Sequence, residues 1–322
     1  MQGEPDPAFR PLDSSLRECK PCLLCGGEAV RVAYEFRADY YSRTRYETAS
    51  WDGRLGLPLQ IVRCVRCDLL FSRPSFRADA LDHVYPSDLV GPNITFARAV
   101  AQSAPKHRSL IKRLRTHLAS GSVCDIGTRY GVLPHLANMA GYDAFGIEYN
   151  SAAVRVARDA GVDVARGSID DVPRLCTERG RTSVDAFVLD DVLEHLVDPT
   201  AALRLLHAWQ RPGGLLFLQQ MDVESLGHKL FGKHWYYLQP AAHMFYFREA
   251  TLRALLSQTG YDVVAVERPR PLRNLRRTLT RTLPGAAARW FGAGASGSDK
   301  PSYLTRRFRS ADDTFLVIAK RR

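Results

Sequence analysis

Residues 121–150 constrain the fold more than any other part of this chain. A short β-rich run, 123–126, stops at Gly127, and Gly131 opens an apolar pattern with helical spacing. A second β-rich run follows and ends in an acid, Glu148. Glycines let the backbone approach a ligand, and a carboxylate after the second strand can accept hydrogen bonds from both hydroxyls of a ribose. The stretch therefore predicts a strand–loop–helix–strand unit for a ribose-bearing cofactor.

The loop of this unit departs from the dinucleotide-binding fingerprint, because it lacks the Gly-x-Gly-x-x-Gly spacing. With Asp125 two residues before Gly127, the pattern instead resembles motif I of class I S-adenosylmethionine (SAM) methyltransferases. That family usually has glycine where Arg129 stands. The arginine side chain must therefore point away from the cofactor or take part in binding it.

Alternating strand and helix patterns continue after this unit. The predicted helices are 109–118, 151–160, 200–209 and 250–259, and the predicted further strands are 162–164, 184–189, 215–219, 261–266 and 314–319. We expect a turn at 212–214 and an antiparallel pairing of the last two strands, because no helix links them. The alternation predicts an α/β fold with a Rossmann-like, seven-stranded, doubly wound sheet and ligands at the carboxyl ends of its strands.

The resemblance extends beyond motif I. Residues 190–199, followed by a helix and Arg211-Pro-Gly-Gly, look like the segment after the fourth strand of class I SAM methyltransferases. Trp235 with Pro240-Ala-Ala-His243 resembles one branch, which includes ubiquinone and menaquinone O-methyltransferase relatives and enzymes of glycan and secondary metabolism. The likeness covers nearly all of residues 18–267.

The resemblance implies a cofactor-binding set made of Asp125, Gly127, Gly131, Glu148, Tyr149, Ser168, Ile169 and Asp190. The first three would line the methionine end of SAM, and Glu148 would hold the ribose. Tyr149, Ser168 and Ile169 would contact the adenine, and the backbone carbonyl of Asp190 would face the cofactor's amino group. A solvated strand-end acid at 148 and a plain loop serine at 168 are the alternative interpretations.

Methyl transfer is an in-line displacement, so the protein must position the acceptor and remove the proton of a hydroxyl. Residues 222–247 follow the fifth strand and are rich in histidine and aromatic residues. Histidine suits proton abstraction near neutral pH, and we expect His243 to be the base. Shaping of the pocket is its alternative role. Trp235 is either a stacking platform or a core residue, and Glu194 with His195 either begins the next helix or acts in catalysis.

Five of the seven cysteines lie in the first seventy residues, and four of them form two Cys-x-x-Cys pairs: Cys22, Cys25, Cys64 and Cys67. Two such knuckles can present four thiolates to one zinc ion, which predicts a structural zinc site in a zinc-ribbon-like module. A register that uses Cys19 with Cys22 is the alternative. We prefer Cys25 because Gly26 follows it, and a knuckle needs a residue there that tolerates left-handed geometry.

These patterns predict four segments. They are a disordered N-terminus at 1–17, a zinc-binding module at 18–75, a helical linker or lid at 76–108, and a methyltransferase domain at 109–322 with a basic insertion at 268–311. The N-terminus does not read as a signal peptide and no run has membrane-spanning length, so we expect a cytoplasmic protein.

The net charge of +11 is concentrated at one end of the chain. Residues 268–322 hold 14 of the 45 Lys and Arg residues but only 3 of the 34 acids, so the rest of the chain is balanced. Within this tail, 272–291 places leucines at helical spacing among arginines and ends in Trp290-Phe291. That pattern suits a helix on an anionic membrane surface, and a helix packed on the sheet or a lid for an anionic acceptor are the alternatives.

The predicted function is SAM-dependent methyl transfer to a small-molecule or glycan acceptor, with O-methylation favoured. Alternatives are carbon methylation of a sugar, nucleic-acid methylation and a zinc scaffold with a degenerate SAM domain. Nucleic acid is disfavoured because the excess charge lies far from the zinc module. The sequence does not name the acceptor or the oligomeric state.

Overall fold

The computed structural model describes residues 17–36, 59–77, 94–240, 242–268 and 313–322. The chain divides into two compact units. The first comprises Met1–Val84, Met221–Thr251 and Arg268–Phe315 and is called the cysteine unit below. The second comprises Tyr85–Gln220, Leu252–Glu267 and Leu316–Arg322 and is called the sheet unit.

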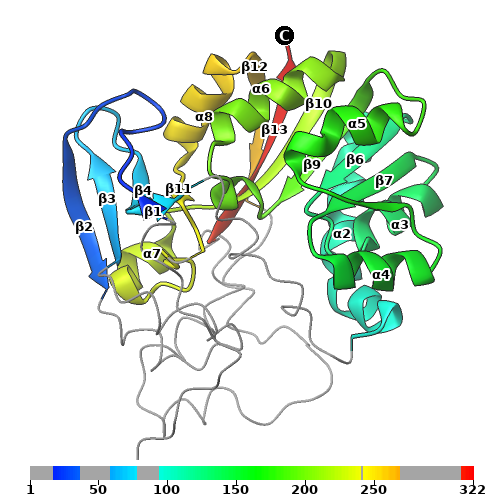
Figure 1. Cartoon of the computed structure of the whole chain (residues 1–322), viewed down its shortest axis with the longest axis horizontal. Coiled ribbons are helices and arrows are strands. Elements are labelled where there is room, and N and C mark those ends of the chain that lie inside the picture. The colour runs from blue at the N-terminus through cyan, green and yellow to red at the C-terminus, as the bar shows by residue number, and fades with distance from the viewer. Residues whose placement is uncertain (1–16, 37–58, 78–93, 241, 269–312) are drawn as a thin grey trace, which may run out of the picture. The chain divides into compact units, whose positions relative to one another are not determined.

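The sheet unit is built on a seven-stranded sheet (Figure 1). Its strands are β6 (Ser122–Ile126), β7 (Asp143–Glu148), β8 (Val164–Arg166), β9 (Val184–Asp190), β10 (Gln210–Met221), β12 (Tyr261–Glu267) and β13 (Thr314–Arg321). Their spatial order is β12-β13-β10-β9-β6-β7-β8. The five strands from β10 to β8 pair in parallel, and β12 pairs antiparallel with β13. The predicted Rossmann-like sheet and its antiparallel last pair are confirmed.

The strand order places a topological switch point between β6 and β9, because the chain runs outward from β6 to β8 and then returns to the other side of β6. Ligands of open parallel sheets bind outside the carboxyl ends of the strands at such a point. The loops after β6, β7 and β9 are therefore where a cofactor site is expected.

Helices alternate with these strands. They are α2 (Phe96–His117), α3 (Val132–Met139), α4 (Ser151–Asp159), α5 (Val172–Thr177), α6 (Pro199–Trp209) and α8 (Glu249–Gln258), with 3-10 turns η5 (Ile169–Asp171) and η6 (Leu193–His195). Buried side chains of α2 and α3, such as Leu114 and Leu133, share one core cluster with strand residues such as Val123 and Phe217. The apolar helical faces seen in the sequence thus cover the sheet, as the hydrophobic effect requires.

The helix α2 is longer than predicted. The sequence pattern suggested a start near Ser109, but the helix begins at Phe96 and continues through Pro105. The side chain of Thr95 caps it by accepting a hydrogen bond from the backbone N of Arg98 at 3.3 Å. Proline removes one backbone hydrogen bond, yet burial of residues on both sides of it, including Ala99 and Leu110, keeps the helix continuous. Residues 96–108 of the expected 76–108 linker are thus helix.

The predicted turn at 212–214 is also wrong in kind. Residues 210–221 form one strand, β10, with a register irregularity between Gln210 and Leu215 where it pairs with β9. Gly213 has a φ of 72°, which lets the irregularity form without the strain that a side chain would cause. The turn-like Pro-Gly-Gly signal therefore marks a bulge rather than the end of an element.

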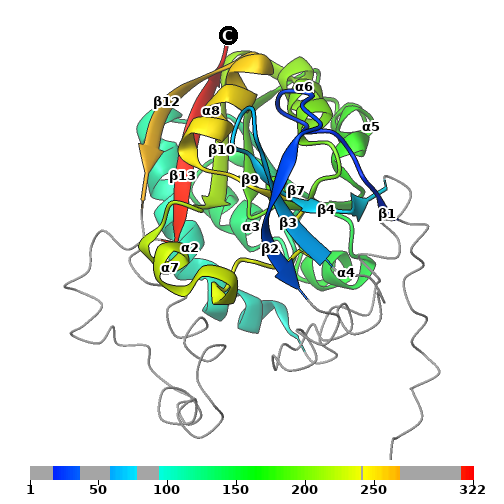
Figure 2. The ribbon, with the colours of Figure 1, turned by 90° about the vertical axis from the view of Figure 1, so that its left-hand side faces the viewer.

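The cysteine unit holds a second, four-stranded sheet in the order β11-β4-β3-β2, and all three pairings are antiparallel (Figures 1 and 2). Its elements are β1 (Arg17–Glu18), β2 (Val30–Phe36), β3 (Leu59–Cys64), β4 (Leu70–Arg73), β5 (Ser75–Phe76), α7 (Leu226–Phe231), the turn η7 (Gly232–His234) and β11 (Phe245–Tyr246). Strands β2 to β4 lie where the sequence predicted a zinc-binding module. Strand β11 comes from far along the chain.

Residues 221–251 are part of the cysteine unit, which the sequence did not indicate. Trp235 is fully buried there, in a core cluster with Phe36, Ile61 and Leu70. Its indole Nε1–H donates to Asp313 Oδ1 at 3.0 Å. Of the two interpretations of Trp235, the core residue is therefore the one the structure supports.

No helix among the described residues is long and apolar enough to cross a membrane. Residues 1–16 of the predicted disordered N-terminus lie outside the described residues, and so does the predicted amphipathic helix at 272–291.

Candidate functional site

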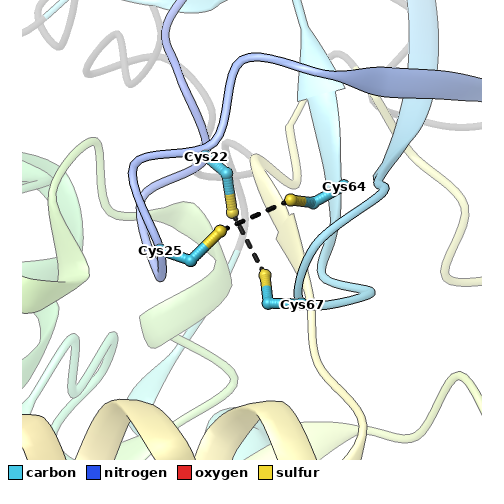
Figure 3. A group of neighbouring side chains, drawn as sticks. All are labelled: Cys22, Cys25, Cys64 and Cys67. Carbon is cyan, nitrogen blue, oxygen red and sulfur yellow. Dashed lines mark hydrogen bonds between the residues drawn. The ribbon is translucent and has the colours of Figure 1, made fainter.

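The four predicted cysteine ligands converge in the cysteine unit (Figure 3). Their sulfur atoms all lie within 4.8 Å of one another. The Sγ atoms of Cys22 and Cys67 are 3.4 Å apart, and those of Cys25 and Cys64 are 3.5 Å apart. Four sulfurs at the Zn–S distance of about 2.3 Å form a tetrahedron with edges of about 3.8 Å. The thiol cluster therefore fits a zinc ion after small adjustments.

The two knuckles have matching backbones, which explains how the sulfurs are aimed. Cys22 O accepts from Gly26 N at 2.7 Å, and Cys64 O accepts from Asp68 N at 3.0 Å. Gly26 and Asp68 are both left-handed, with φ of 68° and 69°. Burial acts to raise the pKa of Cys64, but hydrogen bonds from the backbone of Cys67 and its neighbours outweigh it and lower that pKa to about 7. Such amides favour a thiolate, which is the form that binds zinc, whereas burial raises the pKa of Cys22 to about 11 and also raises that of Cys67.

Cys19 is exposed and does not belong to this cluster. The alternative register that used Cys19 with Cys22 is therefore not the one the fold assembles. The reason is the glycine after Cys25, whose left-handed backbone closes the first knuckle.

In the sheet unit, the loop after β6 turns through a series of left-handed residues. Gly127, Arg129 and Gly131 have φ of 69°, 56° and 72°. A Cβ on Gly131 would lie only 2.9 Å from Val164 and 3.0 Å from Val162, so this position needs glycine for space as well as for conformation. The predicted glycine loop is therefore present at the carboxyl end of β6.

Glu148 lies at the carboxyl end of β7 and joins two loops. Its Oε2 accepts from the backbone N of Arg129 at 2.7 Å, and its Oε1 accepts from the backbone N of Asn150 at 2.8 Å. Burial raises its pKa, and these hydrogen bonds oppose the rise. Each carboxylate oxygen has a further lone pair, so hydrogen bonds from a ribose remain possible. Arg129 thus serves the site through its backbone, while its exposed guanidinium lies over the ring of Tyr130.

The remaining predicted cofactor residues lie at the same edge. Asp125 is buried at 4% exposure in β6, and burial raises its pKa to about 8. Ser168 precedes η5 and forms a capping box with Asp171, whose carboxylate accepts from Ser168 N at 2.8 Å. Ile169 is buried and Tyr149 is half-buried. Ser168 therefore has a structural role of its own besides the one that the resemblance implies.

Asp190, at the end of β9, has partners that sequence reasoning missed. Its carboxylate forms an ion pair with Lys106 of α2, and His107 Nε2 lies 3.6 Å from it. Lys106 also lies 3.2 Å from Asp191. Burial alone would raise the pKa of Asp190, but Lys106 and His107 outweigh burial and lower it. Lys106 lies in the segment 76–108 that the sequence assigned to a linker, so the sequence offered no reason to pair it with Asp190.

Glu194 is a second unexpected feature of this edge. It is fully buried in η6, and Gln220 Nε2 donates to its Oε2 at 2.9 Å. Burial and the neighbouring Asp191 raise its pKa to about 8. Helix α6 is capped instead by Asp198, which accepts from Ala201 N at 2.9 Å. The structure therefore excludes the interpretation in which Glu194 begins helix α6.

His243 lies in the cysteine unit, where it is buried. Its Nδ1 lies 2.8 Å from the backbone carbonyl of Tyr237 and donates to it. This bond places the ring proton on Nδ1, so Nε2 is the atom with a lone pair in the neutral ring. The geometry is compatible with a base at Nε2 and equally with a structural histidine.

The parallel sheet, the glycine loop at its switch point and the strand-end carboxylate together define a class I SAM-dependent methyltransferase. Residues 99–266, just over half of the chain, match the methyltransferase domain family, and the chain belongs to that family.

Among curated proteins, the chain is 29% identical over 122 residues to a ubiquinone biosynthesis O-methyltransferase of Bordetella avium. The matched stretch covers 37% of this chain and 50% of that protein. It is 32% identical over 114 residues to the corresponding protein of Xanthomonas oryzae pv. oryzae, covering 34% and 46%. The chain thus spans about half the length of the curated relatives it matches.

Among solved structures, the Burkholderia thailandensis 1,6-didemethyltoxoflavin-N1-methyltransferase is 15% identical, with a TM-score of 0.49 and coverage of 80% of this chain and 97% of that one.

Proposed function

We propose that the protein binds SAM at the carboxyl edge of the seven-stranded sheet and catalyses methyl transfer to a small-molecule acceptor. The observation that carries this proposal is Glu148, held between the glycine loop and the start of α4 by the amides of Arg129 and Asn150. This is the arrangement expected for a carboxylate that receives ribose hydroxyls beside a close-approach loop. Bound SAM supplies a methyl group on a positively charged sulfur, open to in-line displacement.

The charge of the site supports the same ligand. Five acids lie at or just after the carboxyl ends of three neighbouring strands: Asp125, Glu148, Asp190, Asp191 and Glu194. Burial raises the pKa of Asp125 and of Glu194 to about 8, so these two add little negative charge near neutral pH, and Lys106 neutralises part of the charge of the others. A cationic sulfonium would complement the rest, since opposite charges within a low-dielectric site attract strongly. The chain's own residues therefore bind and orient the cofactor.

The acceptor atom that we favour is an oxygen, with His243 as the base. The hydrogen bond from His243 Nδ1 to Tyr237 O supports this, because it presents Nε2 in the form that can take a proton. The names of the ubiquinone biosynthesis O-methyltransferases point the same way, at the level of an analogy. A glycan acceptor and carbon methylation of a sugar are the alternatives within enzymes.

We also propose that Cys22, Cys25, Cys64 and Cys67 bind one structural zinc ion. The sulfur cluster and the matching knuckles support it. Four thiolates leave no open position for water or substrate, so the ion would stabilise the unit rather than act in catalysis.

A cytoplasmic location with peripheral membrane contact through 272–291 remains a proposal that rests on sequence alone. Sedimentation with anionic liposomes at low and moderate salt tests it. Protein that stays in the supernatant at both salt concentrations would contradict it.

Titration calorimetry with SAM tests the central proposal. We expect binding by the wild type and a tenfold to hundredfold loss in Glu148→Ala, since a pair of hydrogen bonds to a charged group is worth roughly 1.5–3 kcal/mol. Glu148→Gln should lose less. The exposed Glu178→Ala in the same unit is the control. No binding by the wild type would favour a degenerate SAM domain, and full affinity in Glu148→Ala would remove Glu148 from the site.

A further inference from the structure

The cysteine unit contains a cavity of about 380 Å³ that the proposed function does not use. Its walls come from β2, β3, the second cysteine knuckle, α7 and the residue before α8. All the lining residues belong to the cysteine unit. Ligand sites in proteins begin at about 300 Å³, so the cavity has room for a small molecule.

Charged side chains dominate this cavity. Arg63, Lys229 and Arg248 face two carboxylates, Asp68 and Glu224, which leaves one positive charge in excess. Arg63 Nη1 lies 3.0 Å from Asp68 Oδ1, and Arg248 Nη1 lies 3.1 Å from Asp68 Oδ2. Glu224 is 3.9 Å from Arg248, at the limit of an ion pair. The carboxylate of Asp68 thus holds two guanidinium groups on its opposite oxygens, and Lys229 carries the excess positive charge.

Arg248 has a donor left over. Its Nε is buried and has no hydrogen-bond partner within the described ranges 17–36, 59–77, 94–240, 242–268 and 313–322. Buried donors are nearly always satisfied, so this Nε shows that Asp68 does not use up the hydrogen-bonding capacity of Arg248. A guanidinium presents its donors in a planar fork that matches the oxygens of a carboxylate or a phosphate.

The second cysteine knuckle places the carboxylate of Asp68 between the two arginines. Asp68 follows the second cysteine of its knuckle with a φ of 69°, where the first knuckle has Gly26 at 68°. A glycine adopts this conformation without strain, and aspartate is among the few other residues that tolerate it. What the aspartate adds is the carboxylate between Arg63 and Arg248. The cysteine knuckle therefore fixes the spacing of the two arginines.

A tyrosine and a histidine complete the wall. His228 Nδ1 donates to the backbone carbonyl of Val223, so its Nε2 accepts from the Tyr34 hydroxyl at 2.9 Å. Burial lowers the pKa of His228, so this ring adds no charge. Because the hydroxyl proton of Tyr34 is directed to His228, the tyrosine oxygen can accept a hydrogen bond from a ligand.

We propose that this cavity binds a small, hydroxyl-bearing organic anion, with its carboxylate or phosphate group against Arg63 and Arg248 and a hydroxyl group against Tyr34. Lys229 adds to the positive charge on the ligand's side. This site is independent of the proposed methyl transfer.

Calorimetry on the full-length protein, at fixed low ionic strength, tests the proposal with three matched probes. Glucose 1-phosphate and gluconate carry the two anionic groups, and glucose is the neutral control. We expect at least one anion to bind and glucose not to bind. Which anion binds more tightly identifies the group that the arginines recognise. Binding of neither anion, or equal binding of glucose, would overturn the proposal.

Variants locate the binding. Arg63→Gln and Arg248→Gln should each weaken the anion at least tenfold, and Tyr34→Phe should weaken it less. Arg31→Gln is the matched control, since Arg31 is an exposed arginine of β2 outside the cavity lining. It should keep the affinity within twofold. An equal loss in Arg31→Gln, or no loss in either cavity variant, would refute the assignment.

Metal content and SAM affinity of each variant are measured alongside. Retention of both shows that the variant is folded, since none of the four cysteines and none of the proposed SAM-binding residues is replaced. SAM binding without anion binding would refute the cavity alone, and anion binding without SAM binding would refute only the proposed function.

Discussion

Replacing Asp125 with asparagine should remove a pH dependence from the stability of the protein. Asp125 is buried at 4% exposure in the central strand β6. Burial raises its pKa to about 8, and the charge of Asp190 adds to the rise, while Thr128 and Lys106 oppose it. Its pKa in the unfolded chain is about 3.9. The folded protein therefore holds a proton on this group that the unfolded chain releases between those two values.

The magnitude follows from linkage. An acid whose pKa is raised in the folded state contributes its full stabilisation of the folded protein at a pH below its pKa in the unfolded chain. This stabilisation is lost as the pH rises towards the pKa of the folded state. The loss is about 1.4 kcal/mol per pH unit between the two values. From pH 5 to pH 7 the contribution of Asp125 should fall by about 2.7 kcal/mol, whereas asparagine does not titrate. Glu194 has a pKa raised in the same direction, but it titrates in both proteins and cancels in the comparison.

Urea unfolding at pH 5, 6 and 7 measures this difference for the wild type and Asp125→Asn. The free energy of unfolding of the wild type, minus that of the variant, should decrease steadily over the series. Asp185→Asn is a matched control, because Asp185 accepts hydrogen bonds from Ser122 and is only partly buried. A difference between wild type and Asp125→Asn that does not change with pH would refute the argument that Asp125 is held protonated.

Three further outcomes are expected. Cys64→Ser should lower the zinc content from one ion per chain, while Cys19→Ser leaves it unchanged; equal content in both, by elemental analysis, would contradict the four-cysteine site. Lys106→Met should destabilise the sheet unit by about 3 kcal/mol in urea unfolding, because it leaves Asp190 buried without its ion-pair partner. Lys112→Met, on the same helix, is the control. Equally small effects of the two substitutions would show that the ion pair contributes little to stability. His243→Ala should reduce turnover at least a hundredfold with SAM affinity within twofold; retained turnover would leave His243 a structural residue that holds Tyr237.

The parts of the fold that sequence predicted well depend on local geometry. Gly127 and Gly131 adopt the left-handed backbone expected of a close-approach loop, and Glu148 ends β7 as predicted. Helix α2 was predicted too short, and only the burial of residues on both sides of Pro105 shows that the helix continues through it. The Pro-Gly-Gly signal near Gly213 failed for a similar reason, since a bulge and a turn use the same residues.

By itself, the sequence determined the alternation of strands and helices, the glycine loop and the two cysteine knuckles. Each of these depends on residues a few positions apart, whose spacing and conformational freedom decide the local backbone. Only the tertiary structure decided which distant groups meet. Lys106 reaches Asp190, and Asp68 reaches Arg248, although these residues lie far apart in the sequence and no pattern in it predicts the pairs. Such ion pairs form because hydrophobic burial brings the segments together. The apolar pattern of a segment predicts that one of its faces is buried, but it does not predict which polar side chains the ends of the segment contact.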